Sequence, residues 1–136
     1  MPPTSSAADQ RPLSVFLVDD DRLLLDMYAL KFKGAGCTVE SFPDPTVALD
    51  KLRQGARPDL ILLDIVMPAL TGFEFLEMVR KEKLAEGTKV VMLSNQGAQE
   101  DTEKALALGA AGYIVKASSI PSEVLEKALA IAHGTA

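Results

Sequence analysis

The sequence predicts an α/β fold in which five parallel strands form one doubly wound sheet with helices on both faces. Short, nearly unbroken apolar runs alternate five times with longer amphipathic runs between residues 14 and 133. The apolar runs are rich in Val, Ile and Leu, which is typical of strands buried on both faces. This (βα)5 order predicts one domain over residues 13–134, preceded by a flexible tail of Pro, Ser and Ala residues at 1–12.

The apolar runs themselves are the expected strands. Four of them are almost continuously apolar, whereas the second is more polar and alternates in character, which suits an edge strand. The five runs are SVFLV (14–18), CTVESF (37–42), DLILLD (59–64), KVVMLS (89–94) and GYIVK (112–116).

The segments between the strands carry apolar residues at helical spacing. In the first, Leu23, Met27 and Leu30 follow one another at intervals of four and three residues, the kind of stripe with which a surface helix packs on its sheet. The expected helices are 21–33, 45–53, 72–84, 98–108 and 121–132. Glycines that suit helix stops fall near several of their ends. These are Gly34, Gly36, Gly55, Gly87 and Gly109.

Composition argues against several classes of protein. The net charge is −5 and no run of Lys or Arg is present, which argues against direct binding of nucleic acid or anionic lipid. No apolar stretch reaches the roughly 20 residues that a membrane-spanning helix needs. The N-terminal residues lack the pattern of a signal peptide, and the single cysteine, Cys37, has no partner for an internal disulfide. We therefore expect a cytoplasmic protein.

Polar residues end four of the five expected strands. Asp19 and Asp20 follow the first strand, Asp64 ends the third, Ser94 the fourth and Lys116 the fifth. The carboxyl ends of parallel strands meet at one edge of the sheet, where ligands bind in open α/β folds. Each residue also has an ordinary interpretation, as a helix cap, a turn residue or a surface lysine. Their joint occurrence at one edge favours a functional site.

The residue types at this edge suit phosphoryl chemistry. Three carboxylates favour a hard divalent cation such as Mg²⁺, which prefers oxygen ligands. A lysine and a hydroxyl group are suitable partners for phosphoryl oxygens, and a carboxylate is able to accept a phosphoryl group. The residue types therefore support phosphorylation of an aspartate, without indicating which aspartate or to what end.

Four stretches give the chain a specific resemblance. FLVDD, LILLDIVMPALTGFEFL, VVMLS and GYIVK, in this order and spacing, resemble the receiver domain of bacterial response regulators, of the chemotaxis-regulator type, over residues 14–133. The resemblance implies the flavodoxin-like strand order 2-1-3-4-5. It implies that Asp64 is the phosphoacceptor. It also implies that Asp19, Asp20, Asp64 and the backbone carbonyl of Val66 bind Mg²⁺.

The resemblance also implies a switch. Ser94 and Lys116 would engage the phosphoryl group, and Tyr113 would change rotamer when Ser94 moves. The third acid, Asp21, lies outside the metal-binding pair, and we interpret it as a cap of the helix that follows. The implied function is a phosphorylation-activated signalling switch, which is not an enzyme beyond its own phosphorylation and dephosphorylation.

The implied partners belong to two-component signalling. A sensor histidine kinase or a histidine phosphotransfer protein would donate the phosphoryl group from a phosphohistidine. The surface of the fourth helix, fifth strand and fifth helix would then change its affinity for a downstream protein, or for an effector domain absent from this chain. We expect a monomer or a weak dimer.

Two positions depart from the usual receiver pattern. Ala117 follows Lys116 where the family usually has a proline after a cis peptide bond, and Asn95 follows Ser94 where a small residue is common. Val66 and Gln96 occupy positions that tune the lifetime of the phosphoryl group in the family. These departures keep open one alternative, a pseudo-receiver that serves as an interaction module without being phosphorylated.

Overall fold

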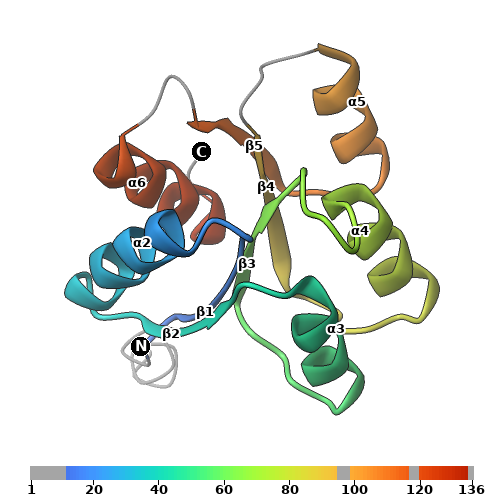
Figure 1. Ribbon diagram of the computed structural model, residues 1–136, viewed down its shortest axis with the longest axis horizontal. Helices are drawn as coiled ribbons and strands as arrows, with labels where there is room; N and C mark the ends of the chain where they lie inside the picture. Colours follow the sequence, from blue (N-terminus) through green and yellow to red (C-terminus); the bar gives the residue numbers. More distant parts are fainter. Residues whose placement is uncertain (1–11, 95–98, 117–119, 135–136) are drawn as a thin grey trace, which may run out of the picture.

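The computed structural model describes residues 12–94, 99–116 and 120–134 and has the expected alternation of strands and helices. Five parallel strands form one sheet in the order β2-β1-β3-β4-β5 (Figure 1). The strands are β1 (Ser14–Val18), β2 (Thr38–Phe42), β3 (Leu60–Asp64), β4 (Lys89–Ser94) and β5 (Gly112–Val115). The helices are α2 (Arg22–Gly34), α3 (Pro45–Arg53), α4 (Gly72–Lys81), α5 (Gln99–Ala107) and α6 (Pro121–Ala132).

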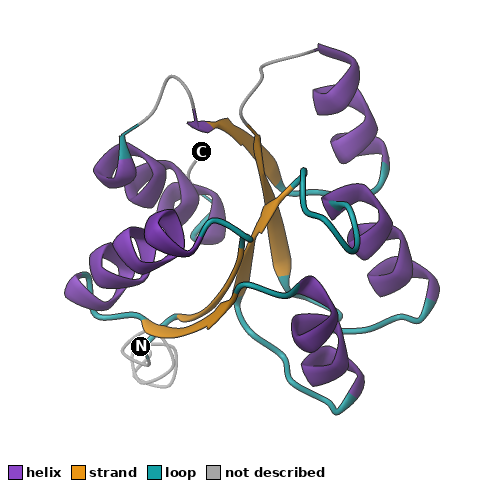
Figure 2. Cartoon of the chain, in the orientation of Figure 1, coloured by secondary structure: helices purple, strands orange, loops and turns teal. Residues whose placement is uncertain are grey.

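Helices cover both faces of the sheet. Helices α2 and α6 lie on one face, and α3, α4 and α5 lie on the other (Figures 1 and 2). Alternate residues of the central strands enter two separate apolar clusters, as for Leu60 and Leu62 on the α2–α6 side and Ile61 and Leu63 on the opposite side. Every residue of β3 and all but the first residue of β1 and β4 are buried, which confirms the prediction for these three runs. In β5 only Ile114 is buried, because this strand lies at the second edge of the sheet. The predicted fold class and strand order are therefore confirmed.

The prediction for the buried face of α2 was wrong. Leu23 and Leu30 are each 73% exposed and Met27 is 42% exposed. The buried stripe of this helix is instead made of Leu25, Tyr28, Ala29 and Phe32. Both sets have helical spacing, so periodicity does not distinguish them. The second stripe is wider and contains two aromatic side chains, and its burial removes more apolar area from water.

Polar caps fix where the helices begin. The Asp21 carboxylate accepts a hydrogen bond from the Leu24 backbone N–H at 3.1 Å, so the prediction that Asp21 caps this helix is confirmed. Helix α4 begins with a capping box, in which Thr71 and Glu74 each accept the other's backbone N–H. The caps position the helix starts next to the carboxyl ends of β1 and β3.

The ends of the helices differ in one respect. Four of the described helices are followed by a glycine in the left-handed conformation, at Gly36, Gly55, Gly109 and Gly134. Helix α4 is followed instead by Lys83, which has a φ of 56°. Backbone N–H groups of Lys83 and Leu84 donate to the carbonyls of Arg80 and Val79, a Schellman motif in which glycine is the usual residue.

No described helix is long and apolar enough to cross a membrane. This statement covers residues 12–94, 99–116 and 120–134. The predicted tail at residues 1–12 falls almost entirely outside the described part of the chain and stays a prediction.

Gly72, the first residue of α4, supports the end of β3. A Cβ atom at this position would lie 2.5 Å from the Asp64 carbonyl oxygen and 2.9 Å from the Ile65 Cα. We predict that Gly72→Ala lowers the free energy of unfolding by about 1–3 kcal/mol, because backbone on both sides must move apart. Urea denaturation measures the change. Gly34→Ala is the control, since nothing lies within 4 Å of its Cβ position. Equal stability of the two variants would contradict the prediction.

Candidate functional site

The polar strand ends gather at one edge of the sheet. Asp19 follows β1, Asp64 ends β3 and Ser94 ends β4, and these residues are only 2%, 4% and 5% exposed. The backbone beneath Asp64 is held on two sides, since the Ile65 N–H donates to the Leu93 carbonyl and the Gly72 N–H donates to the Ile65 carbonyl. The parallel sheet therefore brings together, at one buried edge, the polar groups that end separate strands in the sequence.

Lys116 lies between two of the carboxylates. Its ammonium donates to Asp19 Oδ2 at 2.9 Å and contacts Asp64 Oδ1 at 3.1 Å. The Lys116 side chain is 9% exposed. The other oxygen of Asp19 accepts a hydrogen bond from the Asp21 backbone N–H at 3.0 Å, which fixes the orientation of that carboxylate. The three side chains thus form a buried charge cluster at the ends of β1, β3 and β5.

The cluster shifts the proton affinities of its members. Burial raises the pKa of Asp64 from 3.8 to about 6, and the charge of Asp19 adds to this rise, whereas Lys116 opposes it. Burial by itself would lower the pKa of Lys116, but its hydrogen bond to Asp19 and the charges of both aspartates raise that pKa above its ordinary value. Lys116 is therefore a permanent cation, and Asp64 is a carboxylate at neutral pH whose charge is only partly compensated.

The same edge fits a divalent cation. Asp19, Asp20 and Asp64 each offer one carboxylate oxygen, and these oxygens lie within 4.8 Å of one another. Lys116 compensates only one of the three negative charges, so this edge keeps a net negative charge. A set of carboxylate oxygens with excess negative charge is the donor set that Mg²⁺ takes in proteins. The acidic residues present therefore fit the predicted metal.

The remaining predicted residues lie close by in the fold. Ser94 pairs with Val115 across β4 and β5, and Met92 pairs with Tyr113, so Ser94 and Tyr113 are two register steps apart. Tyr113 is half-buried and packs against the cluster on the α3–α5 face. The side chain of Val66 is 71% exposed in the loop after β3. The roles of Ser94, Tyr113 and the Val66 carbonyl stay predictions, as do those of Asp64, Asp19, Asp20 and Lys116.

Some predicted positions lie outside the described residues. Asn95, Gln96 and Ala117 belong to this group, so the peptide bond between Lys116 and Ala117 is not described either.

Sequence reasoning missed Tyr28. This α2 residue is 2% exposed, and its pKa is raised, first by burial, with Lys116 lowering it and Asp19 and Asp64 raising it further. The phenol therefore lies within electrostatic reach of the charge cluster. In the sequence, only the spacing of four residues between Tyr28 and Phe32 indicates that Tyr28 is buried. That spacing could be recognised only once the buried stripe of α2 was known.

The raised pKa of Asp64 predicts a pH-dependent stability. The folded state binds more protons than the unfolded state between about pH 4 and pH 6. The free energy of unfolding therefore falls as the pH rises through this window. We predict that Asp64→Asn is more stable than the wild type by on the order of 2–3 kcal/mol above pH 7 in metal-free buffer, and by almost nothing near pH 4.

Urea titrations at several pH values measure this difference. Adding Mg²⁺ should reduce it, because a bound cation stabilises the charged form of the carboxylate. Asp26→Asn, on the exposed side of α2, is the charge-matched control. A stability difference for Asp64→Asn that does not vary with pH would contradict the assignment.

Comparison with known proteins identifies the family. The family model of the response regulator receiver domain matches residues 15–129. The probable transcriptional regulatory protein TcrX of Mycobacterium tuberculosis is 31% identical over 118 residues, which cover 87% of this chain and 49% of that protein. The phosphate regulon transcriptional regulatory protein PhoB of Klebsiella pneumoniae is 30% identical over 117 residues, or 86% of this chain and 50% of that protein. The chain thus spans about half the length of these curated relatives.

Solved structures agree with this match. The chemotaxis response regulator CheY4 of Vibrio cholerae superposes with a TM-score of 0.80 at 33% identity, covering 89% of this chain and 99% of that one. A CheY-like receiver domain protein of Methanospirillum hungatei gives a TM-score of 0.80 at 28% identity, covering 92% and 97%. The chain therefore belongs to the family of response regulator receiver domains, the signalling switches of two-component systems.

Proposed function

We propose that this receiver domain accepts a phosphoryl group on Asp64 from a phosphohistidine of a sensor kinase or phosphotransfer protein. The observation that carries the proposal is the buried Asp64 carboxylate, held 3.1 Å from the Lys116 ammonium and beside the carboxylates of Asp19 and Asp20. No other carboxylate among the described residues has both a strongly raised pKa and a buried lysine partner. The proposed nucleophile Asp64 thus lies beside a cation, Lys116, and beside the acid pair proposed to bind the metal, Asp19 and Asp20.

The residues of the chain have distinct roles in the transfer. With a pKa near 6, Asp64 is mostly ionised at neutral pH, and its oxygen attacks the phosphorus as the bond from phosphorus to the donor's imidazole nitrogen breaks. The imidazole takes up a proton as the leaving group, and an acyl phosphate remains on Asp64. Lys116, already beside Asp64, donates to a phosphoryl oxygen. Asp19, Asp20, Asp64 and the Val66 carbonyl would hold Mg²⁺, which would supply positive charge that offsets the repulsion between the anions.

The new phosphoryl group would act at the carboxyl ends of β4 and β5. The acyl phosphate carries about 1.5 to 2 negative charges in place of the single charge of the carboxylate, and it brings several acceptor oxygens beside Lys116 and Ser94. Helix α5 is the element best suited to respond, because Ala105 is its only buried residue. Contacts with α4 hold α5 in place. Arg80 donates to the carbonyls of Leu108 and Gly109, just after α5. The Lys104 ammonium of α5 lies 4.7 Å from the centre of the Phe73 ring.

The loose packing of α5 favours the surface of α5, β5 and α6 as the one that changes its affinity for a downstream partner. Phosphorylation would shift the population between two arrangements of this surface, with Tyr113 following Ser94. The downstream partner is a protein or an effector domain absent from this chain. The related MtrA of Mycolicibacterium paratuberculosis is described as a DNA-binding response regulator, and this chain covers 44% of its length. We place the domain in the cytoplasm, as a monomer or weak dimer that catalyses only its own phosphorylation and dephosphorylation.

The exposed stripe of α2 supports a docking site for the phosphodonor. Leu23, Met27 and Leu30 lie along one side of a helix whose first residue follows the Asp19–Asp21 segment directly. A donor histidine that reaches Asp64 must approach this same edge of the sheet, so its protein would cover the start of α2. Three exposed apolar side chains at helical spacing suit packing against a helix of the donor.

Phosphorylation by a small donor tests the proposal directly. We predict that incubation with acetyl phosphate and Mg²⁺ adds one phosphoryl group to the intact mass of the chain. The addition should be lost in Asp64→Asn and in the presence of EDTA. It should be strongly reduced in Lys116→Ala, because Lys116 contacts both Asp64 and Asp19. A folded, Mg²⁺-binding chain that gains no mass would favour the pseudo-receiver alternative instead.

Substitutions on α2 separate docking from chemistry. We predict that Leu23→Asp combined with Leu30→Asp slows transfer from a histidine kinase that phosphorylates the chain by about tenfold or more, since a charge at each site opposes apolar contact. Phosphorylation by acetyl phosphate should stay within about twofold of the wild type, because that donor needs no docking surface. Leu106→Asp, at an exposed position on α5, is the control. Equal slowing with both donors would show that the variant disturbs the site itself.

A further inference from the structure

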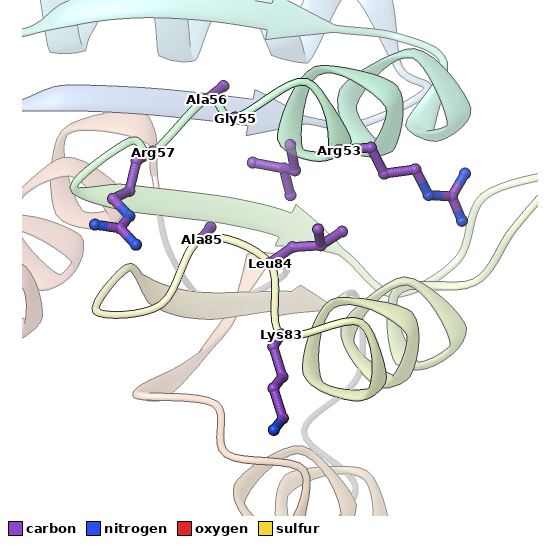
Figure 3. Close-up of a pocket in the computed structure, with 8 residues that line it drawn as sticks. Arg53, Gly55, Ala56, Arg57, Lys83, Leu84 and Ala85 are labelled. Carbon is purple, nitrogen blue, oxygen red and sulfur yellow. The ribbon is translucent and has the colours of Figure 1, made fainter.

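A second concave site lies at the opposite edge of the sheet. It is a hollow of about 360 Å³ between the end of α3 with the loop that follows it and the loop that follows α4 (Figure 3). Both loops lead into the amino ends of strands β3 and β4, whereas Asp64 and Lys116 lie at the carboxyl ends. The residues that line the hollow are Leu52, Arg53, Gly55, Ala56, Arg57, Lys83, Leu84 and Ala85.

The hollow is preformed, because the two loops are tied together on both sides of it. On one side, Arg53 donates to both carboxylate oxygens of Glu82, at 2.9 and 2.8 Å. On the other, the Thr88 hydroxyl donates to the Pro58 carbonyl. Thr88 is itself 6% exposed. A ligand would therefore bind without first ordering either loop, which keeps the entropy cost of binding low.

All the ionisable side chains that line the hollow are cations. The whole chain carries 19 Asp and Glu residues against 14 Lys and Arg residues, so a lining with three cations and no carboxylate runs against its general character. Glu82 neutralises Arg53. Within residues 12–94, 99–116 and 120–134, neither Arg57 nor Lys83 has an ion-pair partner, so the charge available to a ligand comes from these two side chains.

The cations surround an apolar floor. Leu52 is buried and Leu84 is half-buried, and Ala56 and Ala85 complete the floor. Figure 3 shows the side chains of Arg53, Arg57 and Lys83 extending in different directions from its edges. A neighbouring hollow, which shares Arg57, includes Asp59 and Glu86 and so limits the cationic region on that side.

The backbone at Lys83 is a second, independent observation. Four of the described helices are followed by a left-handed glycine, including α3 with Gly55 in the hollow, but α4 is followed by Lys83 with a φ of 56°. Ala85, in the floor, is also left-handed, with a φ of 46°. Side chains other than glycine rarely adopt this conformation, because the Cβ atom crowds the backbone. Lys83 therefore holds its side chain beside the hollow in a backbone conformation that favours glycine.

We propose that this hollow binds an acidic peptide segment of a partner protein. One apolar side chain of the segment rests on the half-buried Leu84, and flanking carboxylates pair with Arg57 and Lys83. Guanidinium and ammonium groups at the edge of an apolar depression provide the two kinds of contact that such a segment offers. Because the hollow lies at the other edge of the sheet, the segment binds whether or not Asp64 is phosphorylated.

The test uses the full chain and defined peptides. Isotope-labelled protein is titrated with the capped peptide EELEE and with the matched peptides QQLQQ and EEAEE, and backbone amide shifts are followed. We expect EELEE to shift amides of residues 52–57 and 83–85, with a dissociation constant on the order of 1 mM. Binding should be lost at about 0.5 M NaCl, and both matched peptides should bind more weakly.

Variants separate a binding role from a structural one. Lys83→Gly removes the cation and relieves the left-handed strain, so it should be at least as stable as the wild type while binding EELEE about two- to fivefold more weakly. Arg57→Gln should weaken binding similarly. Lys81→Ala, an equal loss of charge on α4 outside the lining, should not. Phosphorylation by acetyl phosphate should be unchanged in all three variants.

Three results would overturn the proposal. The first is no shift at residues 52–57 and 83–85 with EELEE. The second is unchanged affinity for EELEE in the stable Lys83→Gly variant. The third is equal binding of EELEE, EEAEE and inorganic phosphate at the same amides, which would make the hollow a simple anion site rather than a peptide site.

Discussion

The contact of the Lys116 ammonium with both Asp19 and Asp64 is the interaction on which the functional edge depends. The carboxylates of Asp19 and Asp64 are buried and that of Asp20 is exposed, with one oxygen of each within 4.8 Å of the others, so they repel one another, and the ammonium holds the two buried ones in place. Burial and the charge of Asp19 outweigh the effect of Lys116, so the pKa of Asp64 is raised to about 6. The site is therefore stable enough to fold and still has a deficit of positive charge. That deficit makes the site suitable for a divalent cation.

The surrounding fold divides into rigid and loosely held parts. Strand β3 is buried along its whole length, and the Gly72 backbone packs directly against the carbonyl of Asp64, so the proposed phosphoacceptor has little freedom to move. Helix α5 is the opposite case, since only Ala105 among its residues is buried and polar contacts from α4 hold its end. A charge added at a rigid site is transmitted most readily to the element with the least packing to lose.

The acidic cluster and the hollow lie at opposite edges of the sheet and have opposite net charge. The carboxyl ends of the strands carry Asp19, Asp20 and Asp64, and the hollow at the amino ends is lined by Arg57 and Lys83. The same topology produces both, because β-to-α loops and α-to-β loops lie at opposite edges of a parallel sheet. One edge is thereby suited to a cation and a phosphoryl group, and the other to carboxylates, without competition for space. A receiver domain with both sites would use one surface for phosphoryl chemistry and a separate one for binding a partner segment whether or not Asp64 is phosphorylated.

The order of the elements, the class of fold and the residues at the carboxyl ends of the strands could all be predicted from the sequence. Continuous apolar runs identify buried parallel strands, and such strands must end at a common edge, so the proximity of Asp19 and Asp64 was predictable. Which stripe of α2 is buried could not be predicted, because both stripes have the same period and only packing against the sheet favours the one with Phe32. The contact of Lys116 with two aspartates, and the hollow formed by the loops around Lys83, likewise depend on tertiary structure, because they join segments far apart in the chain.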